Sequence, residues 1–495
     1  MKKLNVIFII ILLITQIACR DDYRKLREAR AIWISRFDYV SPDKNPERMK
    51  SLILNYLKNA RNSKMNIVFF QVRGNADAFY NSSYEPWSKM LTGTLGKDPE
   101  WDPLQFAIDA AHYLGLELHV WINTFPVWRA KEGLPEESNP RHIMLEHPDW
   151  IVCDKDGGKM NPEEGYICLS PGIPEVKSHI CKVVMDIVRK YDIDGVHFDY
   201  IRYPEESKKF GYSSDEISRK RFNSAEGNPQ NLSWEDWQRN EINTFVSMVS
   251  DSIRSYKPYV KISAAVIGSY KKNRWNAYDE VFQDPIQWLN NNKMHFIVPM
   301  TYMKKEPFML AINEWKELID VANIYPGLAA YKANEWGWEE LWDEIEYIRE
   351  NGFQGLVFFS ASSLNKIWKE LINDKIVNWA NIPYFQDGVN TFTPSIKNFK
   401  VERIDEDKVK IEWDLPENGN EYYFNIYRTK LSRFSNIDDL ELVFITPRGV
   451  SNFVDNTKED FYYAISVLNR YNKESEISKL KKPINVKSIS YLEKK

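Results

Sequence analysis

The segment DGVHFDYIRYP, residues 194–204, places four chemically active side chains within seven residues. His197, Asp199, Arg202 and Tyr203 accompany a short apolar run that is typical of a buried strand. Alternate residues of a strand face opposite sides, so His197 and Asp199 share one face. A buried carboxylate needs a partner or a chemical role, because burying an unpaired charge is expensive. Asp199 is therefore the first candidate for a catalytic group, and a structural ion pair with Arg202 or His197 is the alternative.

Polar and aromatic side chains also follow other strand-like runs. They are Arg73, Asp77 and Glu85 after the second run, Trp121 and Asn123 in the third, Tyr302 in the sixth, and Tyr331, Glu335 and Trp336 at the seventh. Carboxylates, amides and flat rings that converge on one rim describe a sugar site, because aromatic faces stack on sugar rings.

Hydrolysis of a glycosidic bond normally requires two carboxyl groups with different pKa values. Asp199 is the first of them, and we rank Asp77 and Glu335 level as the second, with Asp38 and Glu85 below. Trp121, Tyr302, Tyr331 and Trp336 are candidates for ring stacking, and Arg73, Asn123, His197 and Arg202 for polar substrate contacts.

The elements that must position these residues are eight strand-like runs separated by amphipathic helical runs. The runs cover residues 31–37, 67–72, 117–123, 195–201, 261–267, 296–302, 325–331 and 356–360. Such alternation predicts a parallel sheet in an α/β fold, and eight strands close a (β/α)₈ TIM barrel over residues 28–384. An open doubly wound sheet is the alternative, but no glycine-rich phosphate loop follows the first strand.

A second domain follows the barrel. Short alternating segments at 401–404, 409–413, 422–428, 442–445 and 462–467 predict a small all-β sandwich over residues 392–484, and 485–495 form a tail. The segments VKIEWDLP and YYFNIYRT resemble fibronectin type III strands, with Trp413 in the core.

The N-terminus is typical of an exported protein. Two lysines precede a short apolar run, and residues 1–18 resemble a lipoprotein signal peptide that ends before Cys19. We expect Cys19 to carry the lipid, residues 19–27 to form a tether, and the protein to reside in the cell envelope. Secretion without a lipid is the alternative. The three other cysteines allow at most one disulfide, with Cys153–Cys168 as a candidate pair, and free thiols are favoured.

Composition excludes some functions. The net charge of −4 argues against a nucleic-acid partner, which usually binds a basic surface. The chain has seven His, and we place His119 and His197 alone inside the barrel, so we expect no metal and no cofactor.

Ordered segments between about residues 28 and 370 resemble the bacterial glycosyl hydrolase-like 10 family. They are IWISRFD, FFQVRGNADAFYNSSYEPWSKMLTG, WDPLQFAIDAAHYLGLELHVWINTF, HPDW, LSPGIPEV and YDIDGVHFDYIRYP. The resemblance implies a TIM barrel, export and action on glycans, including peptidoglycan strands without peptides.

The resemblance also implies roles for individual residues. The family's strand-four Asp falls on Asp199, its strand-two Asp on Asp77 and its strand-three Asn on Asn123. Two positions depart from the family pattern, because Ala76 replaces a glycine and Tyr200 replaces a frequent second acidic residue.

Three functions remain open from the sequence. The first is an exported glycoside hydrolase acting on a polysaccharide, with peptidoglycan glycan as one option. The second is a non-catalytic glycan-binding surface lipoprotein on a hydrolase scaffold, and the third is a metal-dependent barrel hydrolase such as a deacetylase. Two carboxyl groups at the barrel mouth would favour the first, a lone Asp199 the second, and clustered His and Asp side chains the third.

Overall fold

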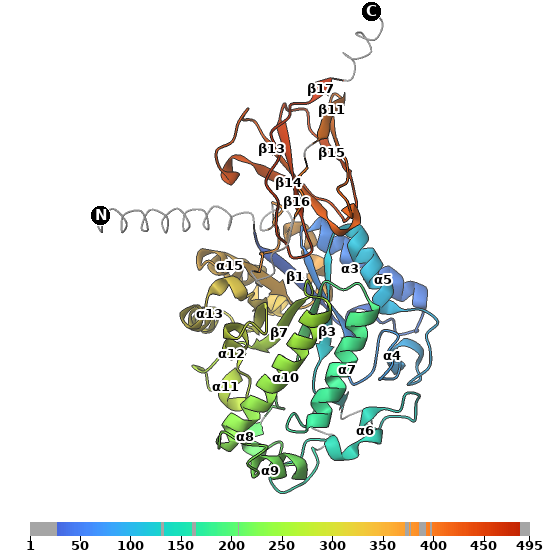
Figure 1. The fold of residues 1–495 in the computed structure, drawn as a ribbon, viewed down its shortest axis with the longest axis vertical. Helices are drawn as coiled ribbons and strands as arrows, with labels where there is room; N and C mark the ends of the chain where they lie inside the picture. Colours follow the sequence, from blue (N-terminus) through green and yellow to red (C-terminus); the bar gives the residue numbers. More distant parts are fainter. Residues whose placement is uncertain are drawn as a thin grey trace, which may run out of the picture.

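A closed barrel of eight parallel strands forms the larger part of the molecule (Figure 1), as the strand pattern predicts. The computed structural model describes residues 27–129, 133–160, 165–205, 207–371, 376, 378–385, 393–396 and 398–485. The barrel strands are β1 (Ala29–Ile34), β2 (Ile67–Arg73), β3 (Glu117–Asn123), β6 (Gly195–Asp199), β7 (Lys261–Ile267), β8 (Phe296–Met300), β9 (Gly327–Leu328) and β10 (Gly355–Phe358). Their order around the barrel is β1-β10-β9-β8-β7-β6-β3-β2.

Helices between the strands cover the outside of the barrel (Figure 1). The longer ones are α3 (Pro46–Asn62), α5 (Pro103–Leu114), α7 (Pro174–Lys190), α10 (Trp234–Tyr256), α12 (Pro285–Asn290), α13 (Glu306–Leu318) and α15 (Trp338–Glu350). Several begin where a polar side chain accepts a hydrogen bond from the first turn, as Asn45, Asp102 and Ser233 do for α3, α5 and α10. A proline at the first position of α3 and α5 suits the start of a helix, because its missing N–H has no intrahelical partner there.

Shorter helical segments lie mainly in the loops at the mouth of the barrel and after β10. They are α2 (Arg36–Tyr39), α4 (Lys89–Thr92), α6 (Ile143–Glu146), α8 (Ser207–Phe210), α9 (Glu216–Phe222), α11 (Ala277–Glu280), α14 (Ala333–Trp336) and α16 (Trp368–Glu370).

Two predicted strands and one unpredicted hairpin differ from the sequence-based expectation in ways that affect the site. The strand predicted for 195–201 ends at Asp199, because Tyr200 adopts the left-handed conformation with φ 49°. The strand predicted for 325–331 is reduced to β9, since a 3₁₀ turn (Ala330–Lys332) follows it closely. A hairpin of β4 (Pro126–Arg129) and β5 (Tyr166–Cys168) in the loop after β3 was not predicted.

The inside of the barrel is packed with aromatic rings. Phe69 and His197 stack with centroids 4.0 Å apart, and Trp33 donates its indole N–H to His197 Nε2 at 3.0 Å. His197 Nδ1 lies 2.9 Å from the Ser263 hydroxyl. Since Nε2 accepts from Trp33, we assign the ring proton to Nδ1. Burial keeps the pKa of His197 well below its usual range, so this layer is neutral.

The C-terminal domain consists of two β-sheets, which bears out the predicted all-β class. One sheet has the order β15-β12-β11-β17 and the other β14-β13-β16. The strands are β11 (Phe399–Asp405), β12 (Lys408–Trp413), β13 (Tyr423–Thr429), β14 (Glu441–Ile445), β15 (Asn452–Asn456), β16 (Tyr462–Leu468) and β17 (Ile484–Asn485). Trp413 packs against Phe424 in the buried cluster between them. The sequence did not predict β15 and β17, and the likeness to fibronectin type III stays a prediction.

The two sheets sit on the end of the barrel where the strands begin (Figure 1). Arg470 pairs with Asp192 and Asp194 just before β6, at 2.7 and 3.3 Å. Lys261, the first residue of β7, donates to the Arg470 carbonyl and pairs with Glu117, both at 2.7 Å. The C-terminal domain therefore closes the floor of the barrel and leaves the opposite end open.

The predicted signal peptide, Cys19 and residues 486–495 lie outside the described residues. Among the described helices, none has the length and apolar character needed to cross a bilayer. Cys153, Cys168 and Cys181 are free thiols, so the candidate pair Cys153–Cys168 does not form a disulfide.

Candidate active site

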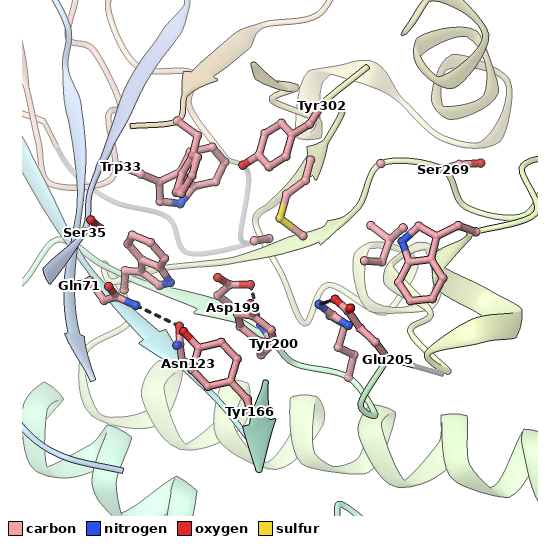
Figure 2. Close-up of a pocket in the computed structure, with 18 of the residues that line it drawn as sticks. Trp33, Ser35, Gln71, Asn123, Tyr166, Asp199, Tyr200, Glu205, Ser269 and Tyr302 are labelled. Carbon is pink, nitrogen blue, oxygen red and sulfur yellow. Dashed lines mark hydrogen bonds and ion pairs between the residues drawn. The ribbon is translucent and has the colours of Figure 1, made fainter. Parts of the chain in front are cut away.

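A cavity of about 510 Å³ opens at the carboxyl ends of the barrel strands (Figure 2). Its lining comes from the ends of seven barrel strands and the loops that follow them. These residues are Trp33, Ser35, Phe37, Gln71, Trp121, Asn123, Tyr166, Asp199, Tyr200, Arg202, Glu205, Ala265, Ile267, Gly268, Ser269, Trp275, Met300, Tyr302, Met303 and Phe359. This end of a barrel is where TIM-barrel enzymes carry their chemistry.

Asp199 is the last residue of β6 and projects into the cavity (Figure 2). One carboxylate oxygen, Oδ1, accepts the backbone N–H of Tyr200 at 2.7 Å. Tyr200 is held at positive φ, a costly conformation for a bulky residue that persists where the surroundings fix it. This turn carries the Tyr200 ring into the cavity lining, whereas simple strand alternation predicts that it faces the helices.

Burial raises the pKa of Asp199 to about 6. The Arg202 guanidinium, the Tyr200 N–H and the Trp121 indole oppose this rise but do not cancel it. The Trp121 N–H favours the charged carboxylate without a well-aligned hydrogen bond, and it has no other partner among the described residues. A carboxyl group with this pKa can hold a proton near neutral pH and deliver it to a substrate.

Arg202 and Glu205 form the side of the cavity next to Asp199. Arg202 Nη2 lies 3.3 Å from Glu205 Oε1, and the guanidinium sits 4.8 Å from the centre of the Tyr200 ring. Tyr200 in turn meets Tyr166 of β5 edge to face, with centroids 5.3 Å apart. The unpredicted hairpin therefore supplies one wall of the site.

Amide side chains line the cavity on the other side of Asp199 (Figure 2). Gln71 donates to Asn123 Oδ1 at 3.2 Å, and Asn123 donates to the Gly74 carbonyl at 3.1 Å. Asn123 pairs with Asp199 in the register of β3 and β6, so the two side chains are neighbours on adjacent strands. These bonds fix the amide orientations next to the carboxyl group.

Aromatic rings frame the opening. Tyr302 stacks against Phe359 with centroids 5.8 Å apart, while Phe37 and Trp275 are 55% and 41% exposed at the cavity. Exposed aromatic faces beside a polar floor suit the stacking of sugar rings.

The structure gathers five of the predicted site residues around one cavity, namely Asp199, Trp121, Asn123, Arg202 and Tyr302. Tyr331 is outside the cavity lining, is exposed, and packs edge to face on Tyr302 with centroids 5.8 Å apart.

Two predicted polar contacts lie deeper. His197 is fully buried under Trp33, where it cannot reach the cavity. Arg73 is fully buried and makes a two-pronged ion pair with Glu85. Although burial raises the pKa of Glu85, Arg73 lowers it to about 2, so this pair is a structural brace under the loop.

The two predicted partner carboxylates do not line the cavity. Asp77 is buried in the loop after β2, where it accepts the Asn75 backbone N–H at 2.8 Å. Glu335 is exposed on α14 and pairs with Lys332 at 2.9 Å, and neighbouring Trp336 lies under the Lys304 ammonium at 5.8 Å. Asp38 caps α2 by accepting the Ser35 N–H and hydroxyl. These positions differ from the prediction that one of these carboxylates lies beside Asp199, because each makes its contacts within a local loop or helix instead.

Some lining residues escaped prediction. Gln71 was detectable, since it alternates with Phe69 on the inward face of β2. Glu205 was detectable too, since it follows Asp199 by six residues in the same segment. Tyr166, Phe37 and Trp275 come from loops and short elements whose folding no local pattern indicates.

Among the described residues, no three His, Cys, Asp or Glu side chains are grouped to hold a metal ion.

Comparison with known proteins identifies the family. The model of the family described as Glycosyl hydrolase-like 10 matches residues 28–342, which is more than half of the chain. The chain belongs to the glycosyl hydrolase-like 10 family. This glycosyl hydrolase-like chain is 28% identical to the glycosyl hydrolase YngK of Bacillus subtilis (strain 168), over 92% of the chain and 93% of that protein.

Further relatives agree with this family. The glycosyl hydrolase DigH of Escherichia coli (strain K12) is 28% identical over 62% of the chain and 74% of that protein. Among solved structures, the glycoside hydrolase domain of PgaB (BpsB) from Bordetella bronchiseptica superposes with a TM-score of 0.50 at 12% identity, over 70% of this chain and 98% of that domain. This last likeness shows a shared fold.

Proposed function

We propose that the protein is a glycoside hydrolase that cleaves a polysaccharide, with Asp199 as the proton donor to the leaving group. The observation that carries this proposal is a carboxyl group with a pKa of about 6 at the centre of an open, aromatic-lined cavity. The family and its named relatives support the reaction class.

The cavity has room for sugar rings beside Asp199. Its volume of about 510 Å³ lies within the usual range of ligand sites, and the exposed rings of Phe37 and Trp275 in its lining offer faces for sugars to stack on. In the proposed reaction, Asp199 gives its proton to the glycosidic oxygen as the bond from that oxygen to the anomeric carbon breaks. The hydrogen bond from the Tyr200 N–H then stabilises the carboxylate that remains.

We also propose that the substrate lies in the cell envelope, with peptidoglycan glycan strands as the first option. The signal-like N-terminus and Cys19 support export and lipid attachment. Fatty-acid labelling of the expressed protein tests the anchor, and the label is expected to disappear in Cys19→Ala.

The reaction is tested by incubating the purified protein with peptidoglycan strands, stripped of peptides or intact, and with other polysaccharides, and identifying products by mass. Asp199→Asn is expected to lower cleavage by at least about 10³-fold. Glu335→Gln is the matched control, because it makes the same change in an exposed carboxylate outside the cavity. Full activity in Asp199→Asn contradicts the proposed role, and binding of a glycan without cleavage by the wild type indicates a non-catalytic lipoprotein.

A further inference from the structure

The cavity has two carboxyl groups in different environments. Of the described residues that line it, Asp199 and Glu205 alone carry a carboxyl group. Asp199 is 8% exposed, whereas the side chain of Glu205 is 65% exposed. Figure 2 shows both side chains facing the same open space. One buried and one water-exposed carboxyl group at the same cavity are the arrangement that acid–base cleavage of a glycoside needs.

Arg202 connects these two groups. Its guanidinium is 5% exposed, pairs with Glu205 at 3.3 Å and rests on the Tyr200 ring. Its Nε is buried and has no partner in the described part of the chain. The ion pair with Arg202 holds the Glu205 carboxylate at the side of the cavity. Because the Glu205 side chain is exposed, water can reach its carboxylate directly.

We propose that Glu205 is the second catalytic residue, the base that activates water, and that Arg202 is a positioning residue that holds it. This inference rests on the proposed glycosidase function. In the step, Glu205 takes a proton from water while the water oxygen bonds to the anomeric carbon. The bond from that carbon to the leaving oxygen breaks, and the leaving oxygen takes the Asp199 proton. The products are a reducing sugar and an alcohol, and solvent returns the proton from Glu205 to Asp199.

The experiment compares Glu205→Gln, Asp199→Asn and the control Glu335→Gln on the glycan that the screen identifies and on a 2,4-dinitrophenyl glycoside of the same sugar. A dinitrophenolate leaves without a proton, so the defect of Asp199→Asn shrinks on this substrate. Glu205→Gln is expected to lower kcat by about 10²–10⁴-fold on both substrates. It is also expected to remove the acid-side fall, which is the decrease of kcat at low pH. Its Tm is expected to equal that of the wild type, because the side chain is exposed.

Four results are decisive. A kcat within about twofold of wild type in Glu205→Gln overturns the inference while leaving the glycosidase proposal intact, and so does a defect that shrinks with the better leaving group. Glu205→Asp provides a second variant that keeps the carboxylate, and recovery of the acid-side fall in it supports the assignment. Failure of the wild type to cleave any glycan overturns the proposed function itself.

Discussion

The two ends of strand β6 carry aspartates in opposite electrostatic states. Asp194 precedes the strand, and Asp199 ends it. Burial raises the pKa of both, but at Asp194 the pull of His112, Arg470 and Arg448 is stronger and brings its pKa well below the usual range. At Asp199 burial prevails and the pKa rises to about 6.

The difference follows from what each carboxylate contacts. Asp194 Oδ2 meets His112 Nε2 at 2.7 Å and the Leu118 N–H at 2.9 Å, and Oδ1 lies near Arg470 of the C-terminal domain. Within the described part of the chain, the Asp199 carboxylate accepts one hydrogen bond, from the Tyr200 N–H. The closed end of the barrel thus gains stability from its carboxylate, whereas the open end keeps a carboxyl group in a costly state that suits proton transfer.

The largest stability effect is expected at the closed end. Asp194→Asn removes the buried carboxylate that His112 and Arg470 contact, leaves the half-exposed Asp192 beside Arg470, and should lower the free energy of unfolding by about 3–5 kcal/mol. Urea unfolding at pH 7 measures this loss. Because the folded-state pKa lies below the unfolded one, the contribution is present above about pH 4 and is lost as the pH falls.

The matched control is Asp251→Asn, which breaks a surface ion pair with Lys293. Exposed pairs contribute about 0–1 kcal/mol, so this variant should unfold close to the wild type. Equal stability of the two variants would show that the contacts of Asp194 with the C-terminal domain do not stabilise the fold.

At the open end, removing the carboxylate should have the opposite effect on the free energy of unfolding. Asp199→Asn should stabilise the protein at pH 7, by up to about 3 kcal/mol, because raising a carboxyl pKa from 3.8 to about 6 disfavours the folded, ionised state. The asparagine Oδ1 can still accept the Tyr200 N–H. The gain should be absent below about pH 4, grow as the pH rises towards 6, and then stay constant. Unfolding curves of wild type and variant at pH 4, 5, 6 and 7 measure this gain. A variant less stable than the wild type at pH 7 would instead support a structural ion pair of Asp199 with Arg202.

The sequence predicted this contrast in part. The alternation in the fourth strand-like run marks Asp199 as inward-facing, and the eight runs predict a closed barrel, so the barrel and its central carboxyl group follow from local patterns. Glu205 could have been inferred from its place six residues after Asp199, whereas the place of Tyr200 in the cavity lining was missed for a physical reason. The left-handed backbone at Tyr200 ends the strand two residues early and redirects the chain, and no pattern in YIRYPEE specifies this conformation. Glu335 was misplaced because the short β9 and the turn after it carry that residue away from the cavity.

The smallest expected effect tests the contrast most directly, because it concerns Arg202, whose positive charge opposes the effect of burial on the pKa of Asp199. Removing this charge in Arg202→Gln should raise the pKa of Asp199 further. If Asp199 must be protonated to act, activity falls as the pH rises through about 6 in the wild type, and the alkaline fall should move upward in the variant. Arg202→Lys keeps a positive charge and should leave the alkaline fall near its wild-type position, while kcat drops because the lysine cannot hold Glu205 in the same way. An alkaline fall that stays in place in Arg202→Gln would mean that the titrating group is not Asp199, and that the two ends of β6 differ in stability alone.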